Sequence, residues 1–236
     1  DPVRRAAHVQ AIATLVTSRG FDGIDLDYEN FAFSDSTASK TSVYTNWPIF
    51  LQQLKAAMPG KILSVTVPPI WSKNSPTDTA RNPDTCSLAY KATYPQGEVP
   101  CRGYLMYNWP ATIGAGIVDR FRIMVYDWSL SQAGPIAPVW WYRDVAQMVE
   151  RVVPAQFQSR VQLGVPSYGR NWARVASGTC PSGTSLSTQS VQMENAAALA
   201  ASKGVSMVRD TTSGEMTFSY DTTVSGPLNS PPPFSS

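Results

Sequence analysis

The chain has 236 residues, of which 43% are apolar and 15% are charged, and its formal net charge is +2. This length and composition can bury the core of one α/β domain of ordinary size. The small, evenly spread charge argues against a nucleic-acid-binding function, and no apolar stretch in the sequence is long enough to cross a membrane.

The first residues predict a helix. Asp1 and Pro2 are typical of a helix N-cap and of the first helical position, and apolar residues with helical spacing follow over Val3–Ser18, up to Gly20. The sequence begins without Met, with no signal peptide and at a helix cap. We therefore expect it to be a segment of a longer protein.

Four short apolar runs predict the buried strands of a parallel sheet. Helical patterns fall between them over Trp47–Met58 and Val139–Val153. This alternation is typical of βα units and predicts an α/β fold. The four runs are Phe21–Tyr28, Lys61–Val67, Phe121–Tyr126 and Val161–Val165.

Two regions depart from this alternation. Residues 70–119 form a long insertion, and beyond Val165 the pattern becomes α+β. There we expect a helix over Ser190–Lys203 and a hairpin over Val205–Tyr220, which turns at residues 212–214. The last residues, 227–236, are rich in Pro and Ser and are predicted to be disordered.

The three cysteines indicate export rather than metal binding. None lies in a CxxC pair and the only histidine is His8, so no metal site is expected. Cys86 and Cys101 bracket a loop rich in Pro, Tyr and Gly, which predicts a disulfide and an extracellular location. Cys180 is then either free or paired outside this chain.

The segment FDGIDLDYEN is the main candidate for chemistry. Because side chains alternate along a strand, Asp25, Asp27 and Glu29 share one face, while apolar residues and Tyr28 share the other. In a barrel strand the acids would point into the lumen. They would approach the carboxyl end of the strand, where barrel enzymes keep their active sites.

Three acids in one narrow column cannot all be ionised. Residues two apart on a strand lie roughly 6.5–7 Å apart, and like charge and burial raise at least one pKa. A general acid that works near neutral pH needs such a raised pKa. Glu29 has the longest reach and is the expected proton donor, Asp27 can share its proton, and Asp25 gives electrostatic support.

Two other interpretations of the acidic face are a solvated strand surface and a metal site of the DxD type. A solvated face would normally include Lys, Thr or Ser, and a metal site would need further carboxylates or histidines at the other strand ends. The sequence offers neither pattern, which favours catalysis.

The segment DGIDLDYE, residues 22–29, resembles the DGxDxDxE signature on the fourth barrel strand of glycoside hydrolase family 18. Further segments resemble later parts of the family in the same order: SVTVPP its fifth strand, MVYD its sixth and LGVPSYGRNW its seventh. The helix and hairpin that end in FSYD resemble a small insertion after strand seven.

The resemblance implies a (β/α)8 TIM barrel, of which the chain holds only strands four to seven. Residues 1–174 would be a partial catalytic barrel domain that includes the insertion 70–119. Residues 175–226 would be part of the α+β insertion between strands seven and eight, followed by the tail 227–236. Strands one to three and strand eight, with its tryptophan, are not found in this sequence.

The implied activity is hydrolysis of β-1,4 linkages in polymers of N-acetylglucosamine, such as chitin. The mechanism would be retaining and substrate-assisted, with no cofactor and no nucleophile from the protein. Glu29 would protonate the leaving oxygen while the substrate's acetamido oxygen attacks. Asp27, backed by Asp25, would orient the acetamido N–H, Tyr126 would donate to the acetamido oxygen, and Asp127 would support the sugar and the acid.

Met124, Trp128, Tyr168 and Arg170 are expected to bind the sugar. An alternative for two of them is that Tyr168 packs and Arg170 pairs with a nearby acid. The tryptophans at 140–141 begin a predicted helix, so one of the two is expected in the core. The expected partner is an oligosaccharide or polysaccharide that contains N-acetylglucosamine, and the expected state is a monomer.

Two other functions fit parts of the same pattern. A sugar-binding lectin on this fold typically lacks the terminal acid of the signature, whereas this chain keeps Glu29. A glucosaminidase that acts on peptidoglycan or N-glycans would have the same catalytic residues, so the signature does not separate it from a chitinase.

Overall fold

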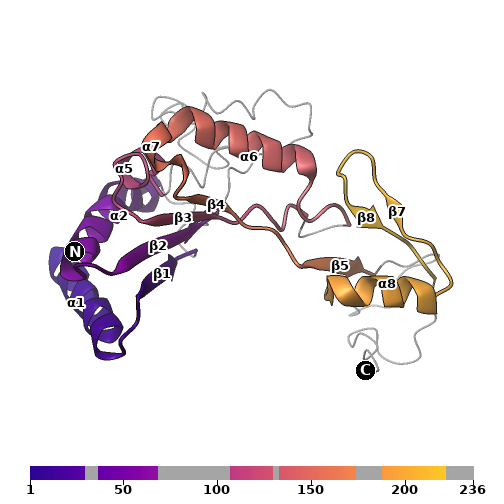
Figure 1. The fold of residues 1–236 in the computed structure, drawn as a ribbon, viewed down its shortest axis with the longest axis horizontal. Coiled ribbons are helices and arrows are strands. Elements are labelled where there is room, and N and C mark those ends of the chain that lie inside the picture. The colour runs from indigo at the N-terminus through magenta and orange to yellow at the C-terminus, as the bar shows by residue number, and fades with distance from the viewer. Residues whose placement is uncertain (30–36, 69–106, 130–132, 174–187, 222–236) are drawn as a thin grey trace. The chain divides into compact units, whose positions relative to one another are not determined.

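The computed structural model describes residues 1–29, 37–68, 107–129, 133–173 and 188–221 (Figure 1). The three cysteines, the predicted tail and most of the predicted insertion lie outside the described residues. The chain divides into two compact units. Asp1–Val125 and Trp141–Gly164 form the first, and Tyr126–Trp140 and Val165–Ser236 form the second.

The first unit is built on a four-stranded parallel sheet in the order β1-β2-β3-β4 (Figure 1). Three of the four predicted runs contain one of these strands, and the run that begins at Phe121 overlaps the fourth, which starts one residue earlier, so the α/β prediction is confirmed at this level. The strands are shorter than the predicted runs at one or both ends. Their bounds are Gly23–Asp27 for β1, Ile62–Val67 for β2, Arg120–Ile123 for β3 and Val161–Leu163 for β4.

Three long helices belong to the predicted βα units: α1 (Pro2–Ser18), α2 (Thr37–Ala57) and α6 (Val139–Val152). Asp1 caps α1 as expected, because its side chain accepts hydrogen bonds from the backbone N–H groups of Val3, at 2.8 Å, and Arg4, at 3.2 Å. The predicted start of α2 at Trp47 was wrong. Pro48 lies inside the helix, although proline favours a first turn, and buried Trp47 and Phe50 pack this stretch into the core.

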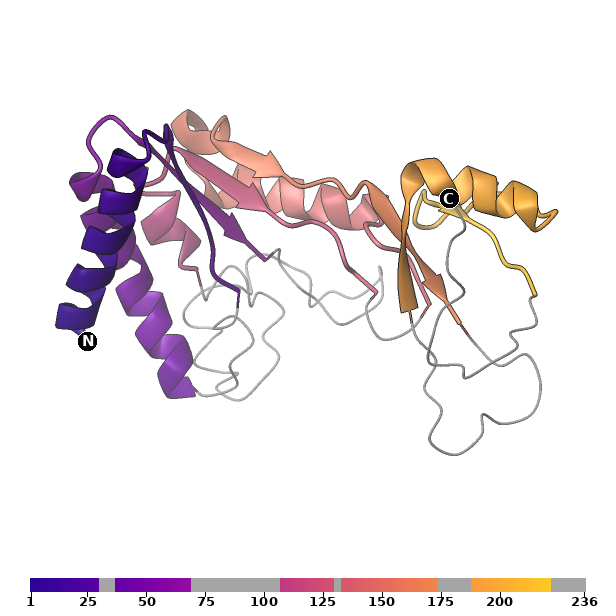
Figure 2. The same ribbon diagram turned by 90° about the horizontal axis from the view of Figure 1, so that it is seen from below.

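The sheet has one apolar face and one polar face. Six apolar strand side chains are fully or almost fully buried and form a core with apolar residues of the helices, which lie along the sheet in Figure 2. The strand members are Leu26, Leu63, Val65, Val67, Phe121 and Ile123, and the helix members include Val16, Leu51, Leu54, Met58 and Met148. The residues between them on the strands are polar, and they carry the candidate site.

Two short helices were not predicted: α5 (Trp109–Thr112) and α7 (Ala155–Gln158). α5 lies within the predicted insertion, yet Trp109 is fully buried and its ring contacts Phe121 edge-on, with the centroids 5.1 Å apart. Asn108, at a left-handed φ of 43°, caps the helix by accepting a hydrogen bond from the N–H of Ala111. The end of the predicted insertion therefore contributes to the core.

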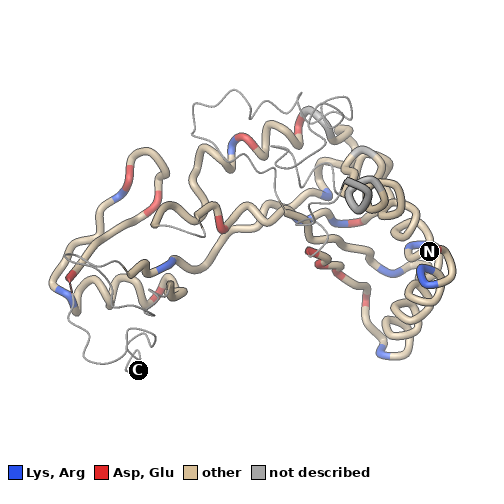
Figure 3. The backbone as a smooth tube through the Cα atoms, turned by 180° about the vertical axis from the view of Figure 1, so that it is seen from behind, with Lys and Arg blue, Asp and Glu red and all other residues tan. Residues whose placement is uncertain are grey.

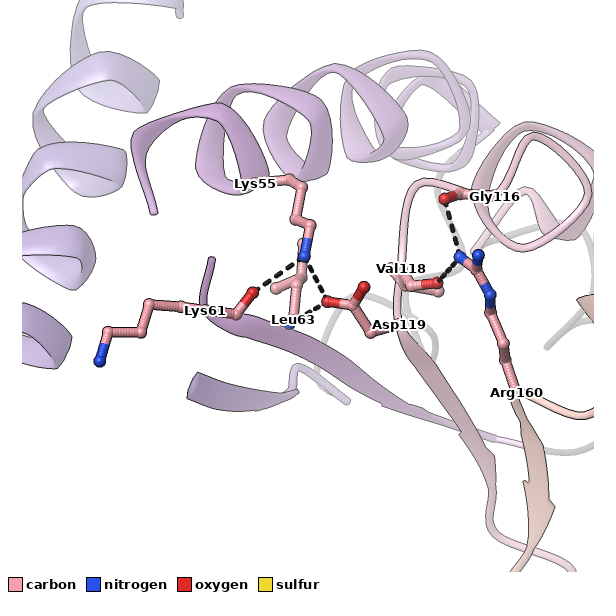
Figure 4. Close-up of polar contacts among 7 residues, drawn as sticks. All are labelled: Lys55, Lys61, Leu63, Gly116, Val118, Asp119 and Arg160. Atoms are coloured by element: carbon pink, nitrogen blue, oxygen red, sulfur yellow. Dashed lines mark hydrogen bonds and ion pairs between the residues drawn. The ribbon is translucent and has the colours of Figure 1, made fainter. Parts of the chain in front are cut away.

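Charged side chains join the amino ends of the strands (Figure 4). The Lys55 ammonium lies 2.5 Å from the Asp119 carboxylate, which also accepts the backbone N–H of Leu63 at 2.8 Å. The Arg160 guanidinium donates to the carbonyls of Gly116 and Val118. Burial opposes ionisation of Asp119, but the hydrogen bonds from Lys55 and Leu63 outweigh it and lower its pKa.

In its described residues, the second unit contains two small antiparallel sheets and one helix, α8 (Met193–Ser202). β5 (Tyr168–Trp172) pairs with β6 (Thr188–Gln192), so the helix predicted from Ser190 begins three residues later, after an extended segment. The predicted hairpin is confirmed by the pairing of β7 (Val208–Arg209) with β8 (Met216–Thr217). Gly214, at φ 77°, lies in its turn.

The hairpin is tied to residues 126–140 of the same unit. The Glu215 carboxylate accepts the backbone N–H groups of Ile136, at 2.9 Å, and Ala137, at 2.5 Å. The N–H of Val139 donates to the carbonyl of Ser213 at 2.8 Å. Across the described parts of both units, the helices are too short or too polar to qualify as membrane spans.

Candidate active site

The acids of the signature lie on the polar face of β1. Asp25 and Asp27 are exposed, while Leu26 between them is 2% exposed and packs into the core. Glu29 follows the strand and is half-buried. Figure 3 shows the acidic positions gathered along β1 and just beyond it. The alternation expected from the sequence is therefore present in the structure.

Asp25 is held by polar groups of the neighbouring strands. Thr66 on β2 donates from Oγ1 to Asp25 Oδ2 at 2.6 Å. Arg122 on β3 places Nη1 3.3 Å from Asp25 Oδ1. Both carboxylate oxygens thus have a donor, which gives Asp25 a defined orientation within the row.

Asp27 differs from Asp25 in its proton affinity. Desolvation and then the negative charge of Asp25 raise the pKa of Asp27 above its ordinary value. The acid row therefore contains a carboxyl group that holds its proton to a higher pH than an ordinary aspartate side chain does. A site that transfers protons near neutral pH requires this property of at least one member.

Tyr28 anchors the end of β1 on the opposite face. Its hydroxyl lies 2.5 Å from Nε2 of His8 on α1, and its ring stacks on Phe50 of α2 with the centroids 6.2 Å apart. Its backbone carbonyl accepts a hydrogen bond from the hydroxyl of Tyr107, which is fully buried. These contacts fix the backbone immediately before Glu29.

The environment of Tyr107 also reports on the acids. Burial, followed by the charges of Glu29 and then Asp27, raises the pKa of the Tyr107 hydroxyl. The hydroxyl therefore stays protonated and remains a hydrogen-bond donor. Tyr107 therefore lies beside the acid row, because its hydroxyl contacts Tyr28 and the charges of Glu29 and Asp27 raise its pKa.

A second group of predicted residues surrounds Asp127 in the second unit. Asp127 has a φ of 62°, a left-handed conformation that a residue other than glycine seldom adopts. Its Oδ1 accepts hydrogen bonds from the hydroxyl of Tyr168, at 2.7 Å, and from Nη2 of Arg170, at 2.8 Å. The ring of Tyr126 contacts that of Tyr168 edge-on at 6.4 Å between centroids.

The hydrogen bonds around Asp127 are charge-assisted. Burial, and then the bond to Asp127, raise the pKa of Tyr168, and the same carboxylate raises the pKa of Arg170. Arg170 thus pairs with an acid, as one interpretation of the sequence proposed, and that acid is itself a predicted site residue. β5, which carries Tyr168 and Arg170, supports the orientation of Asp127.

The remaining predicted residues lie near these groups in the chain. Met124 continues the line of β3, with its N–H bonded to the carbonyl of Val67 at 3.0 Å. Trp128 contacts Trp140 edge-on, with the centroids 4.8 Å apart. Trp141 is 3% exposed, which confirms that one tryptophan of the 140–141 pair is in the core.

The predicted residues thus form two groups, each described in its own unit. The first unit holds the three acids of the signature and Met124. The second holds Tyr126, Asp127, Trp128, Tyr168 and Arg170. The catalytic and sugar-binding roles assigned to them from the sequence remain predictions.

Sequence analysis missed three side chains that contact or surround the acid row: Thr66, Tyr107 and Arg122. Arg122 had a usable signal, because it lies two residues before Met124 and therefore shares its face of the strand. Thr66 similarly interrupts the apolar run of β2. Tyr107 had none, because it lies in a stretch interpreted as an insertion.

Comparison with known families identifies the class of protein. A model of glycosyl hydrolases family 18 matches residues 1–226, and the chain belongs to this family. The match covers the first unit, the second unit up to residue 226, and the segments on which the resemblance was based.

The individual proteins to which the chain is similar have low sequence identity to it. The chain is 28% identical over 176 residues to a putative sporulation-specific glycosylase, YdhD, of Bacillus subtilis. The alignment covers 73% of this chain and 33% of that protein. A chitinase from Chromobacterium violaceum has a similar fold, with a TM-score of 0.61, 22% identity, and coverage of 90% of this chain and 53% of the other.

A chitinase-like agglutinin from Robinia pseudoacacia also has a similar fold, with a TM-score of 0.56 and 19% identity, over 90% of this chain and 57% of the other. The chain thus spans about half of the solved chitinase and a third of the sporulation glycosylase. Fold similarity at this level extends to chains named as enzymes and to one named as an agglutinin.

Proposed function

We propose that the full-length protein is a glycoside hydrolase that cleaves β-1,4 bonds in polymers of N-acetylglucosamine, such as chitin, with retention of configuration. The observation that carries this proposal is the acid row of β1, in which the pKa of Asp27 is raised and Glu29 follows at the strand end. Membership of glycosyl hydrolases family 18 supports it.

In the proposed reaction, Glu29 gives its proton to the glycosidic oxygen as the bond to the anomeric carbon breaks. The acetamido oxygen of the same sugar attacks that carbon from the opposite side and forms a cyclic intermediate. Asp27 orients the acetamido N–H and stabilises the positive charge that develops. Glu29, now a carboxylate, takes a proton from the water that opens the ring.

The second group supplies the polar contacts to the sugar. Tyr126 donates to the acetamido oxygen, and Asp127 supports the sugar and the acid. The bonds from Tyr168 and Arg170 to Asp127 support this role, because they hold its carboxylate in one orientation before substrate arrives. Met124 and Trp128 complete the proposed sugar contacts.

The four-stranded sheet is proposed to be half of an eight-stranded barrel. Its parallel strands, its apolar face toward the helices and its polar face opposite are the features expected of a barrel wall. The length of the solved chitinase, of which this chain covers 53%, supports further strands in the full-length protein.

Three further expectations remain proposals about the full-length protein. We propose that it is extracellular, that it acts as a monomer, and that Cys86 and Cys101 form a disulfide. The composition of the loop between the two cysteines supports the last.

A glucosaminidase acting on peptidoglycan is the second candidate. The relative named as a sporulation-specific glycosylase favours it, at 28% identity over 73% of this chain. Glu29 and Asp27 would have the same roles, so only the substrate would differ. The two candidates are separated by comparing chitooligosaccharides with purified peptidoglycan as substrates.

The experiment that tests hydrolysis compares the full-length protein with its Glu29→Gln variant on a chromogenic chitotrioside. We expect turnover to fall by several orders of magnitude, while binding of the trisaccharide, measured by calorimetry, changes little, because the amide keeps the shape and loses the proton. Glu194→Gln, an exposed site on α8, is the matched control.

Wild-type protein that binds the sugar and hydrolyses neither chitooligosaccharides nor peptidoglycan would instead favour a lectin, as the agglutinin with a similar fold suggests. Near-wild-type turnover in Glu29→Gln would refute the assignment of the proton donor.

A further inference from the structure

The hairpin of β7 and β8 holds a neighbouring stretch of the second unit through a side chain (Figure 1). Glu215 is half-buried just before β8, and both of its side-chain oxygens accept backbone N–H groups. Oε2 lies 2.9 Å from the N of Ile136, and Oε1 lies 2.5 Å from the N of Ala137. Ile136 is 6% exposed, so its N–H is shielded from water and needs an acceptor from the protein, which Glu215 supplies.

A second contact joins the turn of the hairpin to the start of α6. The backbone carbonyl of Ser213, which is 3% exposed, accepts the N–H of Val139 at 2.8 Å. This N–H belongs to the first residue of α6, where the helix itself offers no acceptor. The packing is also close, because a Cβ added at Gly214 would lie 2.8 Å from Cγ2 of Val139. The hairpin therefore holds residues 136–139 at two points.

Both contacts lead to Trp128. Its N–H donates to the carbonyl of Ile136 at 2.8 Å. Its ring contacts the ring of Trp140, the second residue of α6, edge-on with the centroids 4.8 Å apart. The backbone of Trp128 is thus held by the stretch that Glu215 binds, and its ring by the helix start that Ser213 binds.

The turn that carries these acceptors is closed by its own hydrogen bonds. The side chain of Asp210 accepts the hydroxyl of Ser213 at 2.6 Å and the N–H of Thr212 at 3.1 Å. The N–H of Asp210 donates to the carbonyl of Glu215, and the N–H of Gly214 donates to the carbonyl of Asp210, both at 2.8 Å. A turn closed in this way presents its acceptors in one geometry.

We propose that Glu215 is a positioning residue. By holding the N–H groups of Ile136 and Ala137, it fixes Trp128 in the orientation in which its ring meets the sugar. The inference rests on the proposed function, which makes Trp128 a sugar contact. Glu215 acts through the backbone, and no contact with substrate is assigned to it.

The proposal separates Trp128 from the residue before it. Asp127 is oriented by hydrogen bonds from Tyr168 and Arg170, neither of which lies on the hairpin. Loss of the Glu215 side chain should therefore leave Asp127 in place and release Trp128. An aromatic ring that contacts the sugar equally in the ground state and the transition state affects KM rather than kcat. The expected signature is thus a change in KM.

Support of the hairpin alone is the alternative role for Glu215. In that case its removal would lower the melting temperature, while the folded protein would keep Trp128 in its wild-type environment and would keep its KM. The proposed role changes both the environment of Trp128 and the KM, which separates the two roles.

The test compares Glu215→Ala, which removes both acceptor oxygens, with Glu215→Gln, which keeps one. Glu194→Ala, the same change at an exposed site on α8, is the matched control. Two readouts are recorded on the full-length protein. The first is KM and kcat on a chromogenic chitotrioside. The second is fluorine NMR of protein labelled with fluorotryptophan, in which the Trp128 signal is assigned by its loss in Trp128→Phe and requires no activity.

In Glu215→Ala we expect KM to rise about three- to tenfold, with kcat within about twofold of wild type and with a shifted and broadened Trp128 signal. Glu215→Gln should show the same changes to a smaller extent, and it serves as the test if Glu215→Ala fails to fold. Glu194→Ala should match wild type in both readouts.

A Trp128 signal with the wild-type shift and width in Glu215→Ala would overturn the proposal, as would an equal change in Glu194→Ala. An unchanged KM in a Glu215→Ala protein that hydrolyses the trioside would also overturn it. Wild-type protein without hydrolytic activity would refute the proposed function alone. The fluorine signal would then still decide whether Glu215 positions Trp128.

Discussion

Two aspartates of the first unit, Asp27 and Asp119, lie at opposite ends of the sheet and have opposite proton affinities. Asp119, at the amino ends, has a lowered pKa because bonds from Lys55 and Leu63 outweigh its burial. Asp27, at the carboxyl end of β1, has a raised pKa because burial and the charge of Asp25 act together. The same residue type thus stabilises structure at one end and is suited to chemistry at the other.

The largest expected effect concerns the carboxyl end. Asp27→Asn in the full-length enzyme should lower kcat by about 10²–10³-fold, because the amide cannot stabilise the charge that develops on the intermediate. KM should change little. Removing a carboxyl group whose pKa is raised should leave stability at neutral pH unchanged or slightly higher, since ionisation of Asp27 costs folding free energy there. Steady-state kinetics and thermal melting measure the two effects. A lower melting temperature together with wild-type kcat would contradict this account, because Asp27 would then stabilise the fold and take no part in catalysis.

The second prediction concerns Asp119, at the amino ends of the strands. Asp119→Asn should lower the free energy of unfolding by about 1–2 kcal/mol, because it removes the ion pair with Lys55 and weakens the bond to Leu63, both partly exposed to solvent. The kcat of the folded protein should stay at the wild-type value. Urea denaturation gives the free energy, and a double-mutant cycle with Lys55→Met isolates the pair. A large loss of kcat without a loss of stability would contradict the structural role assigned to Asp119.

The pH dependence of the free energy of unfolding also tests the stabilising role of Asp119. The lowered pKa of Asp119 means that its stabilising contribution is fully present above the unfolded-state pKa, near 3.8, and is lost as the pH falls through the folded-state pKa. The free energy of unfolding of Asp119→Asn should therefore depend less steeply on pH below about 4 than that of wild type. The free energies of unfolding are measured by urea denaturation between pH 2 and 6. The same pH dependence in the two proteins would refute this expectation.

The smallest expected effect concerns the backbone before Glu29. Tyr107→Phe removes the hydroxyl that donates to the carbonyl of Tyr28, and we expect kcat to fall by about five- to tenfold with KM unchanged. Tyr142→Phe is the control, because it removes a similar bond, to the carbonyl of Gly164 just after β4. Equal losses in the two variants would indicate a general packing effect rather than support of the acid.

The elements that the sequence predicted well are those set by local patterns. The alternation of acids around Leu26 located β1 and its two faces, and Asp1 located the start of α1. These features depend on a few adjacent residues, so periodicity and capping chemistry were sufficient to predict them.

The features that the sequence did not predict depend on residues far apart in the chain. The helix predicted over Trp47–Met58 begins ten residues earlier, at Thr37, and the packing of Trp47 and Phe50 keeps this stretch inside α2. The contact between Asp25 and Arg122 spans 97 positions of the chain, and no local pattern indicates which strands are neighbours. The donors to Asp127 likewise come from β5, which was not predicted as a strand.

The stereochemistry of the first product tests the central claim most directly. If the substrate's acetamido group is the nucleophile and Glu29 is the only acid and base, hydrolysis of a chitooligosaccharide by the full-length protein should first release the β-anomer. Proton NMR, recorded within the first minutes before mutarotation, distinguishes the anomers. Initial release of the α-anomer would show direct attack by water and would contradict the proposed mechanism.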